Sequence, residues 1–180
     1  ENYIIDFLKK RVGLLDGVCI TGGEPLLQDG IEDFIKTIKD LGFSVKLDTN
    51  GSFPDKLKFL VNNNLVDYVA MDIKNSLEKY PLTVDIKNYD TKKIKTSIEF
   101  LMQNKIPFEF RTTVVKEFHD VNDIENIAKV INGTKNYYLQ NFEDSGNLIG
   151  ENLHSVSKET LLKMKESASK FIQNVEIRGV

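Results

Sequence analysis

The chain has 180 residues, of which 41% are hydrophobic and 28% are charged, and its formal net charge at neutral pH is −3. This length and composition are those of one globular domain with its own core, and they exclude a disordered chain. The acidic balance argues against a general binder of nucleic acid or anionic membranes, and no apolar run approaches the roughly 18 residues of a membrane span. A single cysteine, Cys19, excludes an internal disulfide framework. Since the sequence shows no secretion leader, we expect a cytoplasmic protein.

Short runs rich in β-branched and aromatic residues predict the strands of a parallel sheet. These runs show little alternation of polar and apolar side chains, which is typical of strands covered on both faces. In chain order, the predicted strands are Val18–Thr21, Ser44–Asp48, Tyr68–Asp72, Phe108–Val115, Tyr137–Leu139 and Val175–Ile177.

Between the predicted strands, apolar residues recur at the spacing of helices that bury one face. These apolar faces cover residues 3–8, 31–38, 57–61, 94–102, 124–131 and 161–172. Asp29, Ser52 before Pro54, and Ser157 are the predicted helix starts, and Gly42 is the predicted end of the second helix.

Alternating strands and helices predict an α/β fold with a parallel sheet and right-handed crossovers, which could be an open sheet or a barrel. The chain begins with a helix that no strand precedes. We therefore expect the first strand and its loop to lie upstream of Glu1, and residues 1–180 to form a single domain truncated at its N-terminus.

Polar residues gather where the predicted strands end. Because parallel strands place their C-terminal ends on one side of a sheet, we expect these residues to converge. They are Glu24, Asp48, Asp72, Lys74 and Arg111, and Gly22 and Gly23 directly precede Glu24. Two cations can hold a carboxylate, an acid can accept hydrogen bonds from an ammonium, and glycines let a backbone approach a ligand. This combination suits a zwitterion such as an amino acid.

Five segments in this order resemble the motifs of the radical S-adenosylmethionine superfamily. They are Gly22–Pro25, Asp48–Gly51, Met71–Lys74, Phe110–Val115 and Tyr138–Phe142, and the closing Val175–Gly179 is similar too. One such segment is a weak signal, whereas five at strand-like spacing over nearly the whole chain are a strong one. The sequence most resembles the glycyl-radical-enzyme activating branch, above all the activating protein of anaerobic ribonucleoside-triphosphate reductase, with the pyruvate formate-lyase activating enzyme next.

The resemblance implies a partial (β/α)6-type TIM-like barrel and an anaerobic radical SAM oxidoreductase. Its cofactors would be S-adenosylmethionine and a [4Fe–4S] cluster that a CxxxCxxC loop holds. An electron from the cluster would cleave S-adenosylmethionine, and the 5′-deoxyadenosyl radical would remove a hydrogen atom from a glycine of the partner, a glycyl radical enzyme. A reduced electron donor is the second expected partner, and neither nucleic acid nor membrane is expected.

The resemblance also assigns cofactor-binding residues, without a catalytic residue in this chain. Gly23 and Glu24 would hold the amino group of S-adenosylmethionine, and Lys74 would face its carboxylate. Arg111 would add contacts to the carboxylate or the ribose. Asp48 and Asp72 would lie beside Lys74, around a monovalent cation. The full predicted set is Gly22, Gly23, Glu24, Asp48, Thr49, Asn50, Asp72, Ile73, Lys74 and Arg111.

The sequence departs from the family pattern in two places. It has no CxxxCxxC, and Cys19 falls inside a predicted strand, where we interpret it as a small buried hydrophobe. We therefore expect this chain to lie downstream of the cluster loop, to hold no cluster ligand and to be inactive alone. In addition, Asn141–Asp144 stands where relatives often carry a histidine or an Arg-Pro pair near the adenine.

Other interpretations stay open at this stage. The chain could be a non-catalytic S-adenosylmethionine-binding or partner-docking domain, or an aldolase-type barrel that forms a Schiff base on Lys74. Asn50 could cap a helix or make a turn, and Arg111 could belong to an ion pair inside a barrel. His119 and His154 are interpreted as surface-loop histidines and not as metal ligands.

Overall fold

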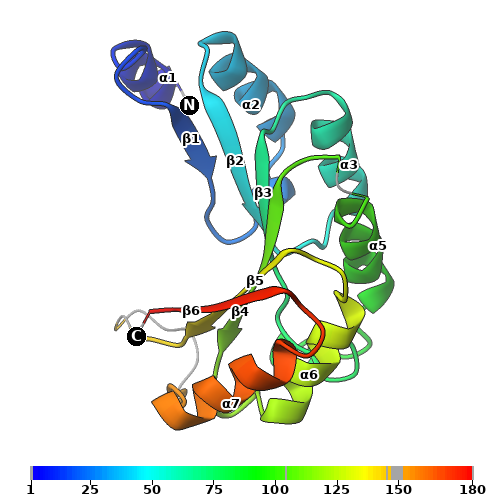
Figure 1. Ribbon diagram of the computed structural model, residues 1–180. Helices are drawn as coiled ribbons and strands as arrows, with labels where there is room; N and C mark the ends of the chain where they lie inside the picture. The colour runs from blue at the N-terminus through cyan, green and yellow to red at the C-terminus, as the bar shows by residue number, and fades with distance from the viewer. Residues whose placement is uncertain (1, 104, 145, 147–151, 180) are drawn as a thin grey trace. The chain divides into compact units, whose positions relative to one another are not determined.

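The computed structural model describes residues 2–103, 105–144, 146 and 152–179 (Figure 1). Within these residues a six-stranded sheet has the order β1-β2-β3-β4-β5-β6. The strands are β1 (Gly17–Ile20), β2 (Ser44–Thr49), β3 (Tyr68–Asp72), β4 (Phe108–Val114), β5 (Asn136–Asn141) and β6 (Asn174–Arg178). The predicted α/β class with parallel strands is confirmed, and each strand begins and ends within two residues of its prediction.

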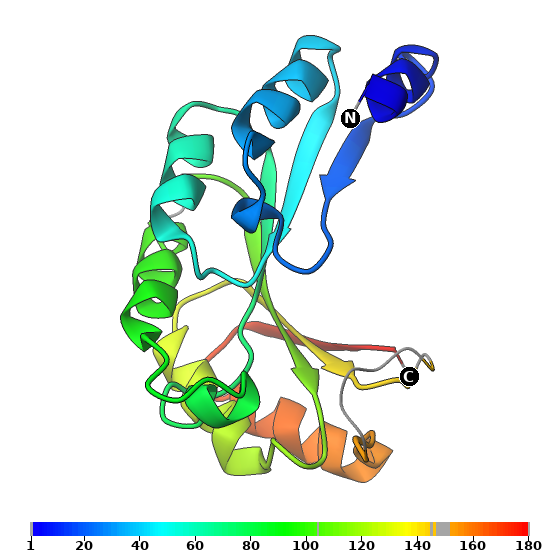
Figure 2. The same ribbon diagram turned by 180° about the vertical axis from the view of Figure 1, so that it is seen from behind.

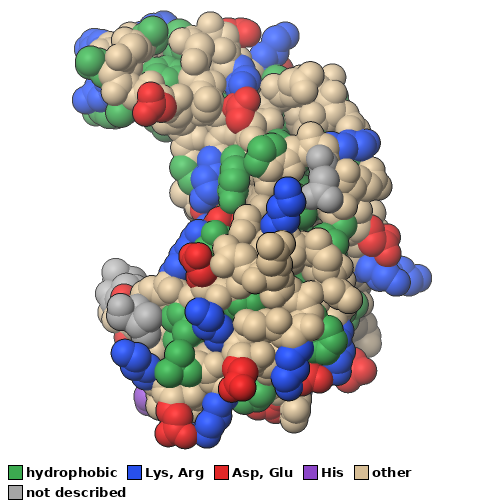
Figure 3. Space-filling view, viewed as in Figure 1, with side chains coloured by type: hydrophobic (Ala, Val, Ile, Leu, Met, Phe, Trp, Pro, Cys, Tyr) green, Lys and Arg blue, Asp and Glu red, His purple; other side chains and the backbone are tan. Residues whose placement is uncertain are grey.

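Helices connect successive strands, as a parallel sheet requires, and a first helix precedes β1. They are α1 (Asn2–Lys9), the 3-10 helix η1 (Pro25–Leu27), α2 (Ile31–Asp40), α3 (Pro54–Asn62), α4 (Tyr80–Thr83), α5 (Thr91–Leu101), α6 (Val121–Val130) and α7 (Lys158–Ala168). Among the residues that the structure describes, none of these helices has the length and apolar character needed to cross a membrane. Acidic and basic side chains are interspersed over the face in Figure 3, as the near-balanced totals of 24 basic and 27 acidic residues suggest.

The chain divides into two compact units, the first formed by Glu1–Met71 and Lys93–Phe108 and the second by Asp72–Lys92 and Glu109–Val180. In the first unit, α2, α3 and α5 lie along one face of β2 and β3 (Figures 1 and 2). Ile35 and Ile38 of α2 and Leu47 of β2 are fully buried at this face. In α2 the apolar spacing read from the sequence is therefore the spacing of the core, whereas in α1 the prediction of a buried apolar face is wrong, because Tyr3, Ile4 and Phe7 are exposed.

Helix ends in the first unit follow the predicted signals only in part. Gly42 adopts a φ of 89° directly after α2, so it ends this helix as predicted. Asp29 is not the N-cap, because Gly30 stands between it and α2 in the left-handed conformation and caps the helix without a side chain. Ser52 is not an N-cap either: Phe53 occupies that position, before Pro54.

In the second unit, α6 and α7 pack against one another and cover one face of β4 to β6 (Figure 1). Ile124, Ile127, Leu161 and Met164 of these helices are buried there. Ser157 caps α7 as predicted, with its hydroxyl oxygen accepting a hydrogen bond from the Thr160 N–H at 3.2 Å. The sequence analysis did not identify the capping box that starts α6.

The prediction of strands covered on both faces is wrong for β2 and β5. Burial alternates along both strands, with Val45, Leu47 and Thr49 buried in β2 and the residues between them partly exposed. The reason is that the helices of each unit cover one face of its strands, while the other face carries polar side chains. Cys19 is exposed, not buried as interpreted from the sequence, because it lies in β1, at the end of the strand order.

Candidate functional site

The Glu24 carboxylate joins the loop after β1 to the end of β2. Glu24 Oε1 accepts hydrogen bonds from the Leu26 N–H at 3.0 Å and from Thr49 Oγ1 at 2.9 Å. Its other oxygen accepts from the Asn50 N–H at 2.6 Å and from the same Thr49 hydroxyl at 3.1 Å. The structure therefore brings together three of the predicted site residues, Glu24, Thr49 and Asn50. Most of the roughly four acceptor positions of this carboxylate are used inside the protein.

The backbone beside this cluster is open. Gly22 has a φ of 141°, and no atom lies within 4 Å of the position that a Cβ would take at Gly22 or Gly23. Both glycines line a cavity of about 500 Å³ in the first unit, together with Ile20, Thr21 and Glu24. A ligand can thus approach the Gly22–Gly23 main chain closely, as the sequence pattern predicted.

The side chain of Asn50 shapes the turn after β2. Its Oδ1 accepts hydrogen bonds from the Ser52 N–H at 2.9 Å and from Ser52 Oγ at 2.5 Å, which is an Asx-type turn. Gly51 follows with a φ of 76°, and a Cβ there would collide with the Met71 thioether methyl group. Of the two structural readings of Asn50, the structure therefore supports the turn.

Asp48 pairs with a lysine on its own strand. Asp48 Oδ1 lies 2.9 Å from Lys46 Nζ, and 16% of the Asp48 side chain is exposed. Residues two apart on a strand share a face, whereas Asp48 and Thr49 point to opposite faces. For this reason Thr49 and not Asp48 contacts Glu24.

A second group of predicted residues meets in the second unit. Arg111 Nε donates a hydrogen bond to Asp72 Oδ1 at 2.8 Å, and Lys74 Nζ lies 3.3 Å from Asp72 Oδ2. The main chains are aligned because the Ile73 N–H donates to the Arg111 carbonyl oxygen at 2.8 Å. One acid thus stands between two cations, and this excess of positive charge suits a carboxylate or phosphate ligand.

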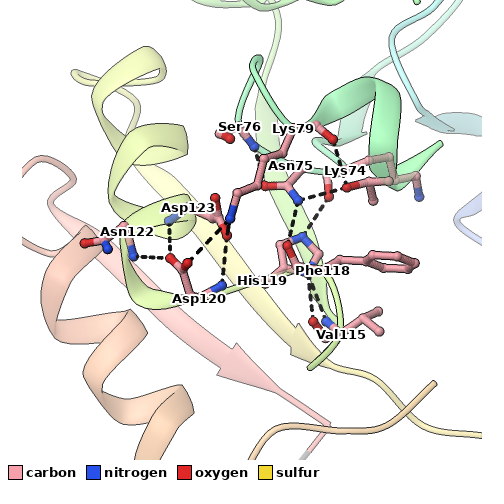
Figure 4. Close-up of polar contacts among 11 residues, drawn as sticks. Lys74, Asn75, Ser76, Lys79, Val115, Phe118, His119, Asp120, Asn122 and Asp123 are labelled. Atoms are coloured by element: carbon pink, nitrogen blue, oxygen red, sulfur yellow. Dashed lines mark hydrogen bonds and ion pairs between the residues drawn. The ribbon is translucent and has the colours of Figure 1, made fainter. Parts of the chain in front are cut away.

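Buried groups that the sequence analysis missed hold the Lys74 segment. His119 was interpreted as a surface histidine, but it is only 6% exposed, and its Nε2 lies 2.8 Å from the Lys74 carbonyl oxygen (Figure 4). Burial lowers the pKa of this imidazole. Tyr80 and Asn75 are also buried beside Lys74. A separation of 45 residues between Lys74 and His119 left no local pattern that could reveal the contact. His154 is exposed as predicted and pairs with Glu117.

An ion pair on the polar face of the second unit was also missed. The Arg178 guanidinium donates hydrogen bonds to both oxygens of Glu109 at 3.0 and 3.1 Å, and it lies 3.3 Å from the centroid of the Tyr138 ring. Glu109 is 4% exposed, and its carboxylate raises the pKa of Arg178. This pair joins the start of β4 to the end of β6 and adds a paired charge that the motifs did not show.

The residues of this chain differ in how well they fit the two expected cofactors. Among the described residues, no three of His, Cys, Asp or Glu are grouped so that they could hold a metal ion. Since Cys19 is the single cysteine of the sequence and a [4Fe–4S] cluster needs several thiolates, the chain does not fit the cluster. The open glycine backbone and the cations around Asp72 do fit the charged groups of S-adenosylmethionine. The predicted residues occur as two groups, one in each unit.

Residues 2–131 match the profile of the family described as the radical SAM superfamily. The chain belongs to this superfamily. Two relatives of this radical SAM chain come from Methanocaldococcus jannaschii, and both carry the name "Putative glycyl-radical enzyme activating enzyme". The first is 37% identical over 98% of the chain and 74% of its own length, and the second is 30% identical over 89% and 62%.

Solved structures show the fold of the superfamily in this chain. A domain of pyruvate-formate lyase-activating enzyme from Bacteroides vulgatus superposes with a TM-score of 0.72 and 18% identity, over 92% of this chain and 100% of that one. SuiB from Streptococcus suis bound to S-adenosylmethionine superposes with a TM-score of 0.76 and 11% identity, over 99% and 43%. These likenesses confirm the predicted partial TIM-like barrel class.

Proposed function

We propose that this radical SAM chain binds S-adenosylmethionine as part of an activating enzyme for a glycyl radical enzyme. The observation that carries the proposal is the group of Lys74 and Arg111 around Asp72, which offers two cations to one anionic ligand group. The relatives named as activating enzymes and the superfamily membership support it.

The residues take separate roles toward the ligand. In the second unit, Lys74 suits an anionic group such as the methionine carboxylate, and Arg111 suits the carboxylate or the ribose. In the first unit, the open Gly22–Gly23 main chain and Glu24 suit an ammonium group, while Thr49 and Asn50 fix the Glu24 carboxylate.

Three further residues complete the proposed binding set. Ile73 is buried, and its main chain aligns the segment that carries Lys74. Asp48 in the first unit and Asp72 in the second each carry carboxylate oxygens of the kind that a monovalent cation prefers. In the structure Asp48 pairs with Lys46 and Asp72 pairs with Arg111, so a cation would compete with these lysine and arginine side chains.

The parent protein is the oxidoreductase, and this chain alone is inactive. A [4Fe–4S] cluster held elsewhere in the parent protein would supply the electron for cleavage of S-adenosylmethionine. A reduced donor protein would supply the electron to the cluster. The protein partner would be an anaerobic ribonucleotide reductase or an enzyme of the pyruvate formate-lyase type. The contribution of this chain is to bind and orient the cofactor in the cytoplasm of an anaerobic cell.

Calorimetry with S-adenosylmethionine tests the binding role. We expect Lys74→Ala to raise the dissociation constant about tenfold, which corresponds to about 1.4 kcal/mol, the size of one charge-assisted hydrogen bond. Lys95→Ala is the matched control, because the Lys95 side chain is 62% exposed on α5. Equal binding by both variants would remove Lys74 from the site.

Product analysis tests the activity of the parent protein. The full-length protein, reconstituted with iron and sulfide and reduced with dithionite, should release 5′-deoxyadenosine, and the present chain under the same conditions should not. If the full-length protein binds S-adenosylmethionine but forms no 5′-deoxyadenosine, the non-catalytic binding domain is the correct reading.

A further inference from the structure

The main chain of Lys74 is held on both sides by buried aromatic side chains. The Lys74 N–H donates a hydrogen bond to Tyr80 Oη at 3.2 Å, and the Lys74 carbonyl oxygen lies 2.8 Å from His119 Nε2. Tyr80 is 1% exposed and His119 is 6% exposed. Burial raises the pKa of the Tyr80 phenol, so the hydroxyl stays neutral. Both peptide groups of Lys74 therefore have fixed partners.

One neutral tautomer of His119 satisfies the Val115 N–H and the Lys74 carbonyl oxygen, while the Val115 carbonyl oxygen, 3.2 Å from Nδ1, accepts from the His119 main-chain N–H instead. The Val115 N–H can only donate, and it lies 3.1 Å from His119 Nδ1, so Nδ1 accepts. The proton of the neutral ring is then on Nε2, where it donates to the Lys74 carbonyl oxygen. A further hydrogen bond, from the His119 main-chain N–H to the Val115 carbonyl oxygen at 2.9 Å, closes the turn that carries the ring.

The segment after Lys74 is anchored to the same loop. Asn75 is fully buried, and its Nδ2 donates to the Phe118 carbonyl oxygen at 3.0 Å and to Thr83 Oγ1 at 2.8 Å (Figure 4). Lys79 Nζ lies 2.7 Å from Asp123, at the start of α6. Lys74, Asn75 and Lys79 thus dock residues 74–79 on residues 115–123, and His119 is the residue that contacts Lys74 itself.

We infer that His119 is a positioning residue for Lys74, and that it sets the place from which the lysine binds the ligand carboxylate. This inference rests on the proposed function. The Lys74 side chain is 39% exposed and has several rotatable bonds, so packing does not fix its ammonium group. The hydrogen bonds to Tyr80 and His119 fix instead the Lys74 Cα, from which the side chain extends. Without the imidazole, the lysine would sample more positions and bind an anion less well.

The test is a double-mutant cycle on the full-length protein, read by calorimetry with S-adenosylmethionine. We expect His119→Leu to raise the dissociation constant about tenfold. In the Lys74→Ala background the same change should have no further effect, because His119 acts through Lys74. His119→Gln keeps an amide donor and should recover most of the affinity. His154→Gln, at the exposed histidine, is the control and should bind as the wild type does.

Hydrogen exchange separates failure of this inference from failure of the proposed function. His119→Leu should speed exchange of the Lys74 amide relative to that of Leu139 in β5. If the wild-type protein does not bind S-adenosylmethionine, the proposed function is wrong, while exchange still decides whether His119 holds Lys74. If Lys74→Ala weakens binding and His119→Leu weakens it equally in both backgrounds, His119 has only a general structural role and the inference is overturned. Unchanged exchange at Lys74 overturns it too.

Discussion

Arg111 Nε lies 2.8 Å from Asp72 Oδ1, so the guanidinium and the carboxylate form a hydrogen-bonded ion pair. The Arg111 side chain is 12% exposed and that of Asp72 is 27% exposed, and the second carboxylate oxygen is 3.3 Å from Lys74. This one carboxylate therefore contacts both cations of the group, and one positive charge is left over for a ligand.

Asp72→Asn should destabilise the protein by about 1–3 kcal/mol. The change leaves two neighbouring cations without their shared acid, and a partly buried pair lies between exposed and buried ones in strength. Urea unfolding measures the effect. The matched control is Asp6→Asn, because the Asp6–Lys9 pair is exposed on α1. A loss no larger than that of the control would show that the Asp72 pairs contribute little to stability.

Gly51→Ala should destabilise the protein more than Gly42→Ala. Both glycines have a positive φ, so an alanine at either position costs roughly 1–2 kcal/mol of backbone strain. At Gly42 no atom lies near the added Cβ, whereas at Gly51 it meets the side chain of Met71. The difference between the two midpoints of thermal unfolding isolates this collision. Equal midpoints would mean that Met71 moves aside without cost.

Glu24→Gln should cost about 1–3 kcal/mol of stability even without a ligand. Oε1 accepts from the Leu26 N–H and Oε2 from the Asn50 N–H, so the amide nitrogen of glutamine faces a main-chain donor in either orientation. Urea unfolding of Glu24→Gln is compared with that of Glu99→Gln, since Glu99 is 63% exposed on α5. Unchanged stability would mean that Glu24 serves the ligand alone.

The strands and their polar ends could be predicted from the sequence because both are local patterns. Apolar runs, helical spacing and the residues that follow each run are visible within a few positions. For this reason Glu24, Asp72 and Lys74 were predicted as site residues, which stays a prediction, and β3 was placed with its correct ends.

The partners of these residues could not be predicted, since they depend on tertiary contacts. Thr49 and Asn50 reach Glu24 across 25 and 26 residues, and no spacing rule links them. Cys19 was interpreted as buried from its residue type, but exposure depends on whether another element covers β1. The opposite error was made for His119. It was predicted at the surface because it is a polar residue in a loop, but it is a buried partner of the Lys74 main chain.

The free energy of unfolding should rise with pH in the range where His119 titrates. Burial lowers the pKa of the folded imidazole below its ordinary value of about 6.5, against the smaller opposing effects of its hydrogen bonds and of Asp123. Below pH 6.5 the unfolded chain then binds a proton that the folded chain does not, and unfolding is favoured as pH falls. Above pH 6.5 the imidazole is neutral in both the folded and the unfolded state, so the free energy of unfolding no longer changes with pH because of His119.

Carboxylates also weaken the fold in acid, so the comparison must be made between variants. Asp120 and Glu117 have lowered pKa values, and their contributions are lost mainly below the ordinary values of about 4. Urea unfolding of the wild type between pH 5 and pH 7 should therefore show a steeper slope than that of His119→Gln, which has no group to protonate at this position. Parallel slopes would show that the imidazole accepts a proton in the folded state, and the assignment of Nδ1 as an acceptor from Val115 would then be wrong.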